Sequence, residues 1–266
     1  MGVHLEPDQR DALSKMHNGC ILCGGTGTGK SITGLAYYFI QNGGGLSEGD
    51  GPGEGYYPMD DPPLDLYIIT PAKKRDSKEW NLELARYLIT EGETNSIYHH
   101  KVVIDSWNNI KKYSNVSGAF FIFDEDKVTG DGTWAKTFIK IARNNQWIIL
   151  SATPGDCWQD YMAVFVANGY YKHPTEFRQN HIVYNPHVPY PDVQSYINTG
   201  RLIRLRNRTV VNMDSVRKTV QHHEYVYCDY DKQMYKDITR NRWNYEKNKP
   251  IENASEYCSQ LRKMRK

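Results

Sequence analysis

The sequence contains a glycine-rich segment, GGTGTGKS at residues 24–31, with the spacing of a phosphate-binding loop. A short apolar run at residues 20–23 precedes it, and a stretch with one apolar face, residues 31–41, follows it. Strand, glycine loop and helix in this order are the context in which such a loop binds nucleotide phosphates. A glycine-rich turn before a helix is the simpler alternative, but the Lys30–Ser31 pair favours the phosphate loop. The sequence therefore predicts a nucleoside triphosphate site.

Each part of the loop has a chemical role in this prediction. The glycines allow successive backbone N–H groups to curve around an anion, and the helix N-terminus adds partial positive charge. Lys30 is expected to reach the β- and γ-phosphates, and the Ser31 hydroxyl is expected to bind Mg²⁺. We therefore assign ATP and Mg²⁺ to these loop residues: Gly25, Thr26, Gly27, Thr28, Gly29, Lys30 and Ser31.

A second signal is the acidic pair Asp124–Glu125, which follows the apolar run 119–123. Downstream of a phosphate loop, an aspartate at the end of a strand holds Mg²⁺. The adjacent glutamate points elsewhere and can orient and deprotonate the attacking water. An acidic pair that caps a helix is the alternative, and the apolar run before the pair favours the catalytic interpretation. Lys30, Asp124 and Glu125 are thus the predicted catalytic residues.

Short apolar runs alternate with helical patterns along the first part of the chain. Strands are predicted at 66–70, 101–107, 119–123 and 146–150, and helices at 76–89 and 134–143. Most of these strands end on a polar residue, so ligands are expected at their carboxyl ends. This alternation predicts an α/β fold with a parallel sheet flanked by helices.

The remaining segments differ in composition. Residues 42–65 are rich in glycine and proline and contain six acidic residues without Lys or Arg, which predicts a flexible acidic insertion. We assign residues 1–195 to the nucleotide-binding domain and 196–266 to a basic, mainly helical extension. Four arginines between Arg201 and Arg208 form either a basic face against DNA or another domain, or a solvated helix.

Localisation can be predicted from what the chain lacks and from its cysteines. No apolar run is long enough to cross a bilayer, and residues 1–10 lack the apolar region of a signal peptide. Five cysteines, an odd number, suit a reducing compartment. We expect a cytoplasmic protein without a membrane partner, which for a viral protein means the host cytoplasm.

Together the motifs resemble the first motor domain of superfamily 2 helicases and translocases. The residues that carry the resemblance are Leu5-x-Pro7-x-Gln9, the loop 24–31, Thr70-Pro71-Ala72, Asp105-Ser106-Trp107, the acidic segment 124–127 and Ser151-Ala152-Thr153. Residues 196–235, with Leu202 to Arg206 and Gln233-x-Tyr235, look like the Swi/Snf-type branch just before its second motor domain. The pattern is also similar to helicase-like proteins of tailed bacteriophages.

The resemblance implies a RecA-like fold and ATP-driven work on DNA, with RNA a less favoured partner. Gln9 would read adenine, and Ser151 and Thr153 would couple the nucleotide to the strand-contacting surface. Contacts to the nucleic-acid backbone would come from Thr70, Lys73, Lys74, Ser106 and Trp107. Lys73 and Lys74 are also favoured by their charge, because Lys and Arg supply many phosphate contacts.

Two departures from the family limit what the resemblance implies. The acidic segment 124–127, which corresponds to motif II of the family, reads D-E-D-K. The family usually has Ala in third place and His, Asp or Gln in fourth. The departure therefore concerns the coupling of the ATP site to the other motifs more than ATP binding itself. Motifs IV to VI lie outside this sequence, so a second RecA-like domain is expected in cis or in trans, and the chain alone should hydrolyse ATP weakly or not at all. A non-motor ATP- or DNA-binding fragment and a DNA-packaging motor are the alternatives.

Overall fold

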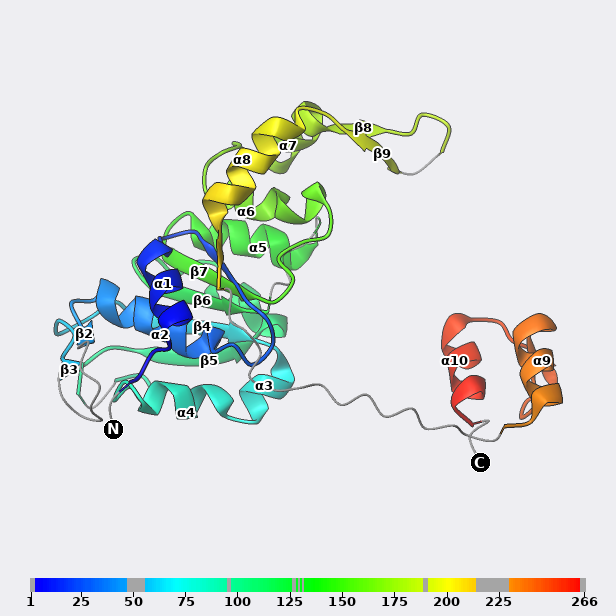
Figure 1. Cartoon of the computed structure of the whole chain (residues 1–266), viewed down its shortest axis with the longest axis horizontal. Coiled ribbons are helices and arrows are strands. Elements are labelled where there is room, and N and C mark those ends of the chain that lie inside the picture. Colours follow the sequence, from blue (N-terminus) through cyan, green and yellow to red (C-terminus); the bar gives the residue numbers. More distant parts are fainter. Residues whose placement is uncertain are drawn as a thin grey trace. The chain divides into compact units, whose positions relative to one another are not determined.

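A six-stranded parallel sheet forms the centre of the structure, in the order β10-β1-β7-β6-β4-β5 (Figure 1). The computed structural model describes residues 3–46, 56–94, 97–125, 128, 130, 132–188, 191–213 and 230–263. The strands are β1 (Ile21–Cys23), β4 (Leu66–Thr70), β5 (Val102–Ser106), β6 (Phe120–Asp124), β7 (Gln146–Ser151) and β10 (Val210–Asn212). The expected parallel α/β fold is confirmed.

Helices cover both faces of this sheet (Figure 1). On one face lie α1 (Pro7–Lys15), α2 (Lys30–Gln41) and α4 (Glu79–Ala85). On the other lie the 3₁₀ helix η1 (Trp107–Tyr113), α5 (Thr133–Ala142), α6 (Met162–Ala167) and α7 (Pro174–His181), with Leu202 of α8 (Thr199–Thr209). The protein therefore has two apolar layers, one on each side of the sheet.

The alternation of side chains along β6 shows why this segment is a central strand. Phe120 and Ile122 pack into the layer with α2, while Phe121 and Phe123 pack into the layer with α5. Successive side chains of a strand point to opposite faces, and a strand buried on both faces is apolar throughout. The same requirement explains the apolar runs of β4 and β7.

Three segments differ from the sequence-based expectation. Within 42–65, β2 (Gly45–Leu46) pairs with β3 (Tyr56–Tyr57) in a short antiparallel ladder rather than an irregular loop, and residues 47–55 lie outside the described part. The helix expected at 76–89 is shortened to α4, and a separate helix, α3 (Ala72–Asp76), precedes it. Lys78, between the two, has a left-handed backbone conformation with φ of 55°.

The third difference concerns residues 173–213, where only α8 had a clear pattern. They form α7, an antiparallel pair of β8 (Ile182–Tyr184) and β9 (Val193–Tyr196), then α8 and β10. β10 pairs with β1 at the edge of the sheet. The first compact unit runs from Met1 to Arg217, and the expected domain boundary after residue 195 stays a prediction.

The second compact unit comprises Lys218–Lys266 and is described between residues 230 and 263. It contains α9 (Lys232–Arg240), a two-stranded pair of β11 (Trp243–Asn244) and β12 (Lys249–Pro250), and α10 (Ala254–Lys263). The aromatic and β-branched residues at 222–230 also predict a strand, and this segment lies almost wholly outside the described residues. None of the helices that the structure describes is long and apolar enough to cross a membrane.

Phe123 provides a test of the sheet's packing. Its ring is fully buried and contacts Phe138 edge-on, with 5.0 Å between ring centroids. We expect Phe123→Ala to lower the free energy of unfolding by about 3–5 kcal/mol, because a large cavity opens in the central strand. Leu82→Ala, at a side chain that is 70% exposed on α4, should change it by less than about 0.5 kcal/mol. Urea unfolding followed by circular dichroism measures both, and equal effects would contradict the assignment of this core.

Candidate nucleotide-binding site

The glycine loop joins the end of β1 to the start of α2. Gly27 and Gly29 have φ of 80° and 87°, which side-chain-bearing residues rarely adopt. A Cβ on Gly29 would also lie 2.3 Å from Gln9 Nε2, so this position requires glycine on two grounds. Because α2 begins at Lys30, the free N–H groups of its first turn lie at the end of the loop. This is the geometry expected of an anion-binding loop.

Lys30 lies along the loop. Its ammonium donates hydrogen bonds to the carbonyl oxygens of Gly24 and Gly25, at 2.7 and 2.8 Å. Burial lowers the pKa of Lys30; the negative charge of Asp124 opposes this shift, and the positive charge of Lys74 adds to it. The Lys30 side chain therefore lies in a pocket where charged groups of both signs act on it.

Gln9 supports the loop from α1. Its side chain is 8% exposed, and its amide donates to the carbonyl oxygen of Thr28 at 3.0 Å. Its carbonyl accepts from the backbone N–H of Glu6, also at 3.0 Å, which closes the first turn of α1 behind Pro7. The side chain thus has partners for both ends of its amide within the protein. Its predicted contact with adenine stays a prediction.

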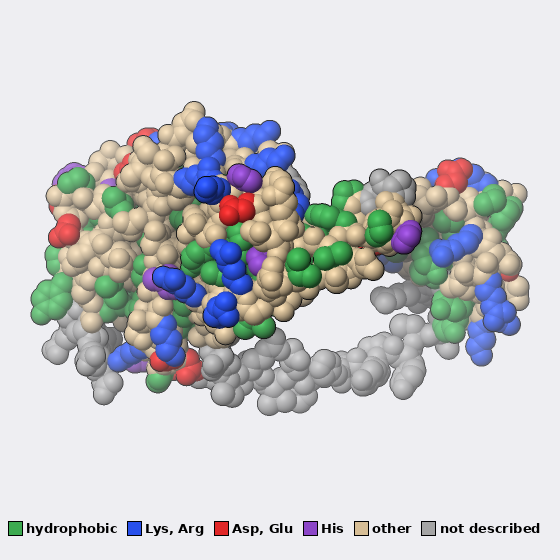
Figure 2. Space-filling model, turned by 90° about the horizontal axis from the view of Figure 1, so that it is seen from above, with side chains coloured by type: hydrophobic (Ala, Val, Ile, Leu, Met, Phe, Trp, Pro, Cys, Tyr) green, Lys and Arg blue, Asp and Glu red, His purple; other side chains and the backbone are tan. Residues whose placement is uncertain are grey.

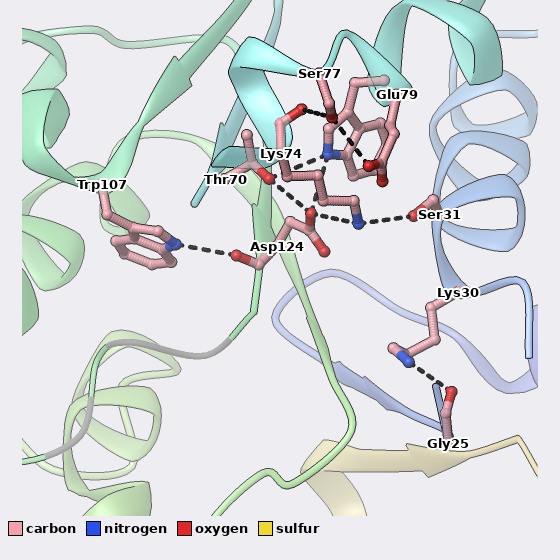
Figure 3. A network of polar contacts seen from close by, with 10 residues as sticks. Gly25, Lys30, Ser31, Thr70, Lys74, Ser77, Glu79, Trp107 and Asp124 are labelled. Atoms are coloured by element: carbon pink, nitrogen blue, oxygen red, sulfur yellow. Dashed lines mark hydrogen bonds and ion pairs between the residues drawn. The ribbon is translucent and has the colours of Figure 1, made fainter. Parts of the chain in front are cut away.

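The carboxylate of Asp124 is the centre of a buried polar network (Figure 3). Its Oδ2 atom accepts from Thr70 Oγ1 at 2.7 Å and from Trp80 Nε1 at 3.0 Å, and pairs with Lys74 Nζ at 2.8 Å. Its backbone carbonyl accepts from Trp107 Nε1 at 2.9 Å. A charge that is 3% exposed is costly to bury unless it is paired and hydrogen-bonded. These donors explain how the carboxylate is tolerated at the end of β6.

Three residues expected to contact nucleic acid have buried side chains in this structure. Thr70 is fully buried, and Ser106 and Trp107 are each 2% exposed. Trp107 packs against Phe123 and Trp134, with ring centroids 5.5 and 6.1 Å away. Thr70 and Trp107 also position Asp124 through their hydrogen bonds to it. The predicted contacts of these three residues with nucleic acid stay predictions.

Asp105, next to Ser106, links α3 to η1. Its carboxylate accepts from Asn109 Nδ2 at 2.8 Å and Tyr113 Oη at 2.7 Å, both on η1, and from Arg75 of α3 at 3.3 Å. Burial by itself would raise the pKa of Asp105, but these hydrogen bonds and that of the Ser106 N–H together lower it. This second buried carboxylate anchors η1 to α3.

The two lysines expected to contact nucleic acid have different environments. Lys73 is exposed on α3, and its role stays a prediction. The Lys74 side chain is only 24% exposed, and its ammonium lies 2.8 Å from Asp124 Oδ2 and 3.4 Å from Ser31 Oγ (Figure 3). Lys74 therefore faces Asp124 and Ser31 in this structure, and its predicted contact with nucleic acid stays a prediction.

Glu125 has an unusual backbone. Its φ is 58°, in the left-handed region that favours glycine, and its N–H donates to the carbonyl of Leu150 at 2.9 Å. Strained positions of this kind persist where the surrounding structure enforces them, and they are frequent at active sites. Because of this turn, the exposed Glu125 side chain lines the pocket beside the buried Asp124.

The motifs converge on one pocket of about 490 Å³ at the carboxyl edge of the sheet. Ser151 ends β7, where its carbonyl accepts from the Gly24 N–H at 3.2 Å and its hydroxyl accepts from the Thr153 N–H at 3.2 Å. Predicted site residues that line the pocket are Thr26, Gly27, Gly29, Lys30, Ser31, Lys74, Asp124, Glu125, Ser151 and Thr153. Thr28 and Gly25 contact each other behind it, through a 2.9 Å hydrogen bond.

Trp80 and Glu83 are site residues that sequence reasoning missed. Trp80 donates to Asp124, and Glu83 lines the pocket from the next turn of α4. In the sequence Trp80 shares a helical face with Leu84, which predicts a core residue, and it is indeed 1% exposed. An indole on an apolar face gives no indication that its N–H meets a carboxylate 44 residues away.

The residues at this edge fit a magnesium ion. Mg²⁺ prefers oxygen ligands, usually one or two carboxylates together with phosphate oxygens. The carboxylate of Asp124 and the hydroxyl of Ser31 are oxygens of this kind, and the same cation, Lys74 Nζ, approaches both. The two side chains thus already meet around one positive charge.

Comparison with solved structures identifies the fold. The structure is similar to the Sulfolobus solfataricus SWI2/SNF2 ATPase core in complex with dsDNA, with a TM-score of 0.57 and 15% identity, over 99% of this chain and 58% of that one. The same ATPase core domain in a second structure gives 0.55 and 15%, over 99% and 56%. This is a RecA-like α/β fold. The chain spans under two thirds of the length of these proteins.

A third neighbour, the Pyrococcus furiosus Hef helicase domain, has a TM-score of 0.40 and 14% identity over 67% of this chain and 40% of that one, too low to add to the assignment. No protein-family model and no curated protein sequence matches the chain at a significant level. At these identities the similarity concerns the fold, so function has to be argued from the site.

Thr70 gives a test of the network around Asp124. We expect Thr70→Val, which keeps the shape and removes the hydroxyl, to lower the free energy of unfolding by about 1–3 kcal/mol, because a buried carboxylate loses a donor. Thr209→Val is the matched control, since Thr209 is equally buried but donates to the neutral carbonyl of Leu205 at 2.8 Å. It should cost less than about 1 kcal/mol. Urea unfolding measures both, and a Thr70→Val cost no larger than that of the control would contradict the network.

Proposed function

We propose that this chain is the first motor domain of an ATP-dependent DNA helicase or translocase of superfamily 2, in the Swi/Snf-like branch. The observation that carries the proposal is the convergence of the loop 24–31, Asp124–Glu125 and Ser151–Thr153 on one pocket. These segments are far apart in the sequence, and an unrelated glycine turn would not bring them together. The RecA-like fold supports the proposal. A relationship to bacteriophage helicases is part of it and rests on the sequence pattern alone.

Several residues of the pocket have a role in ATP hydrolysis under this proposal. The loop N–H groups and Lys30 bind the phosphates, and Ser31 with Asp124 hold Mg²⁺, which when bound neutralises phosphate charge and orients the phosphate oxygens. Glu125 accepts a proton from the attacking water. Ser151 and Thr153 connect this edge of the sheet with the rest of the motor. A second RecA-like domain, in cis or in trans, would supply the arginine that stabilises the transferred phosphoryl group.

DNA is the proposed nucleic-acid partner. The similar SWI2/SNF2 ATPase core is described in complex with dsDNA. Lys73 is exposed on α3 and suits a phosphate contact. Figure 2, which looks down on the side of the first unit that carries α7 and α8, shows Lys and Arg side chains with few acidic ones among them. A surface of this charge attracts phosphates.

The arginines of α8 contribute to that charge but also anchor the helix. Arg206 Nε donates to Tyr161 Oη at 3.1 Å, and the guanidinium of Arg201 lies 4.8 Å from the centre of the Tyr171 ring. Arginine commonly packs over aromatic rings in this way. All four arginines lie at exposed positions of α8, so contact with DNA is a proposal and the solvated helix stays its alternative.

Nucleotide binding is tested at Lys30. We expect Lys30→Ala to weaken ATP binding about 100-fold, because each charge-assisted hydrogen bond to a phosphate contributes about 1.5–3 kcal/mol. Lys15→Ala removes the same charge from an exposed position on α1 and should leave the affinity unchanged. Titration with a fluorescent ATP analogue measures both. An unchanged affinity of the Lys30 variant would show that the loop is wrongly assigned.

Catalysis is tested at Glu125. We expect Glu125→Gln to keep ATP affinity within about threefold and to slow hydrolysis by the complete motor at least 100-fold, since an amide cannot accept the proton. Glu91→Gln, at an exposed loop position, should change neither quantity. Phosphate release with and without duplex DNA is the measurement. Undiminished hydrolysis would exclude Glu125 as the base. ATP binding by the chain with no DNA-dependent hydrolysis in the complete motor would favour a non-motor fragment.

A further inference from the structure

Lys74 lies where the proposed metal site would be. Its ammonium is 2.8 Å from Asp124 Oδ2 and 3.4 Å from Ser31 Oγ, the two protein oxygens that would hold Mg²⁺ (Figure 3). It approaches both oxygens from α3, a helix that starts two residues after the end of β4. A positive charge of the chain itself is thus held between both expected metal ligands.

We propose that Lys74 is a resident cation on the metal position, which Mg²⁺ arriving with a nucleotide must displace. The inference rests on the proposed function, because it takes Ser31 and Asp124 as the ligands of Mg²⁺. It adds a residue that the motif resemblance places on the nucleic-acid side, and it assigns that residue to control of metal binding.

The negative charge of Asp124 holds the Lys74 ammonium at this position. The carboxylate of Asp124 is 3% exposed, and a buried carboxylate that lacks a cation is strongly unfavourable. Trp80 fixes both partners: its N–H donates to Asp124, and its ring face lies 5.3 Å from Lys74 Nζ. A cation over an indole face is attracted by the ring quadrupole. Lys74 is therefore part of the site, with contacts to both Asp124 and Trp80.

Geometry explains why the two cations exclude each other. Mg²⁺ binds oxygen at about 2.0–2.1 Å in a nearly ideal octahedron. An ammonium within hydrogen-bond distance of the same two oxygens would lie against the ion, and two positive charges at such short range repel strongly. Mg²⁺ binding therefore requires the Lys74 side chain to leave Asp124. The apparent metal affinity of this chain is then its intrinsic affinity multiplied by the fraction of time that Lys74 is away from the site.

The inference predicts that Lys74 has different effects on nucleotide binding in the absence and in the presence of Mg²⁺. Without Mg²⁺, Lys74 stays in place and its charge faces the phosphates together with that of Lys30, so nucleotide binding persists. With Mg²⁺, Lys74 is displaced and contributes little to affinity. Removing the lysine should weaken nucleotide binding in the absence of Mg²⁺. It should also increase the gain in nucleotide affinity that Mg²⁺ produces.

The test compares wild-type protein with Lys74→Met by titration with a fluorescent ATP analogue, once in EDTA and once in saturating Mg²⁺. We expect the ratio of the dissociation constant in EDTA to that in Mg²⁺ to be at least about tenfold larger in the variant. Thermal unfolding with Mg²⁺ alone, at constant ionic strength, should show half-maximal stabilisation of the variant at about a tenfold lower Mg²⁺ concentration.

The matched control is Lys15→Met, which removes the same charge from an exposed position on α1. In these assays, which contain no nucleic acid, it should behave as wild type. Lys74→Gln keeps a donor for Asp124 and replaces the methionine variant if circular dichroism shows that the latter is unfolded. Intact nucleotide binding with an unchanged response to Mg²⁺ would overturn this inference alone. Absence of nucleotide binding by wild-type protein would overturn the proposed function and the inference with it.

Discussion

The carboxylate of Asp124 is buried at the end of the central strand, and side chains from several neighbouring elements stabilise it there. Donors reach it from the end of β4 through Thr70, from α3 through Lys74 and from α4 through Trp80. Each donor fixes the position of the element that carries it. The stability of this edge of the sheet and the chemistry of the site thus depend on the same group.

The parallel sheet supplies the second constraint. Parallel strands present their carboxyl ends at one edge, so the residues that follow β1, β6 and β7 must lie near one another. The register brings Cys23 beside Ser151 and Asp124 beside Leu150. One strand, β7, therefore lies between β1, which leads into the glycine loop, and β6, which ends on the acidic pair. The pocket is a direct consequence of strand order.

Much of this could be predicted from the sequence. β4, β6 and β7 were identifiable because they are buried on both faces and apolar throughout. The loop and the acidic pair were identifiable because their chemistry requires particular residues at fixed spacing. β10 could not be predicted, since three residues after an arginine-rich helix carry too little pattern, and only its pairing with β1 defines it.

The burial of the individual motif side chains could not be predicted from the sequence either. The resemblance gives Thr70, Ser106 and Trp107 a role at the surface, but burial is decided by packing between segments far apart in the chain. A hydroxyl or an indole N–H is equally able to face solvent or a carboxylate, and nothing local distinguishes the two. Lys74 and Lys73 illustrate this, because adjacent lysines in one short helix have opposite environments.

The pairing of β10 with β1 also has a mechanical consequence. The strands run parallel in register from Ile21 beside Val210 to Cys23 beside Asn212, and the Met213 N–H donates to the Cys23 carbonyl at 2.7 Å. Met213 also touches the glycine loop, since a Cβ on Gly24 would lie 3.1 Å from its methyl group. Tension on the chain beyond Met213 acts along this ladder and loads its hydrogen bonds in shear. Force applied there is therefore borne directly by the strand that carries the glycine loop.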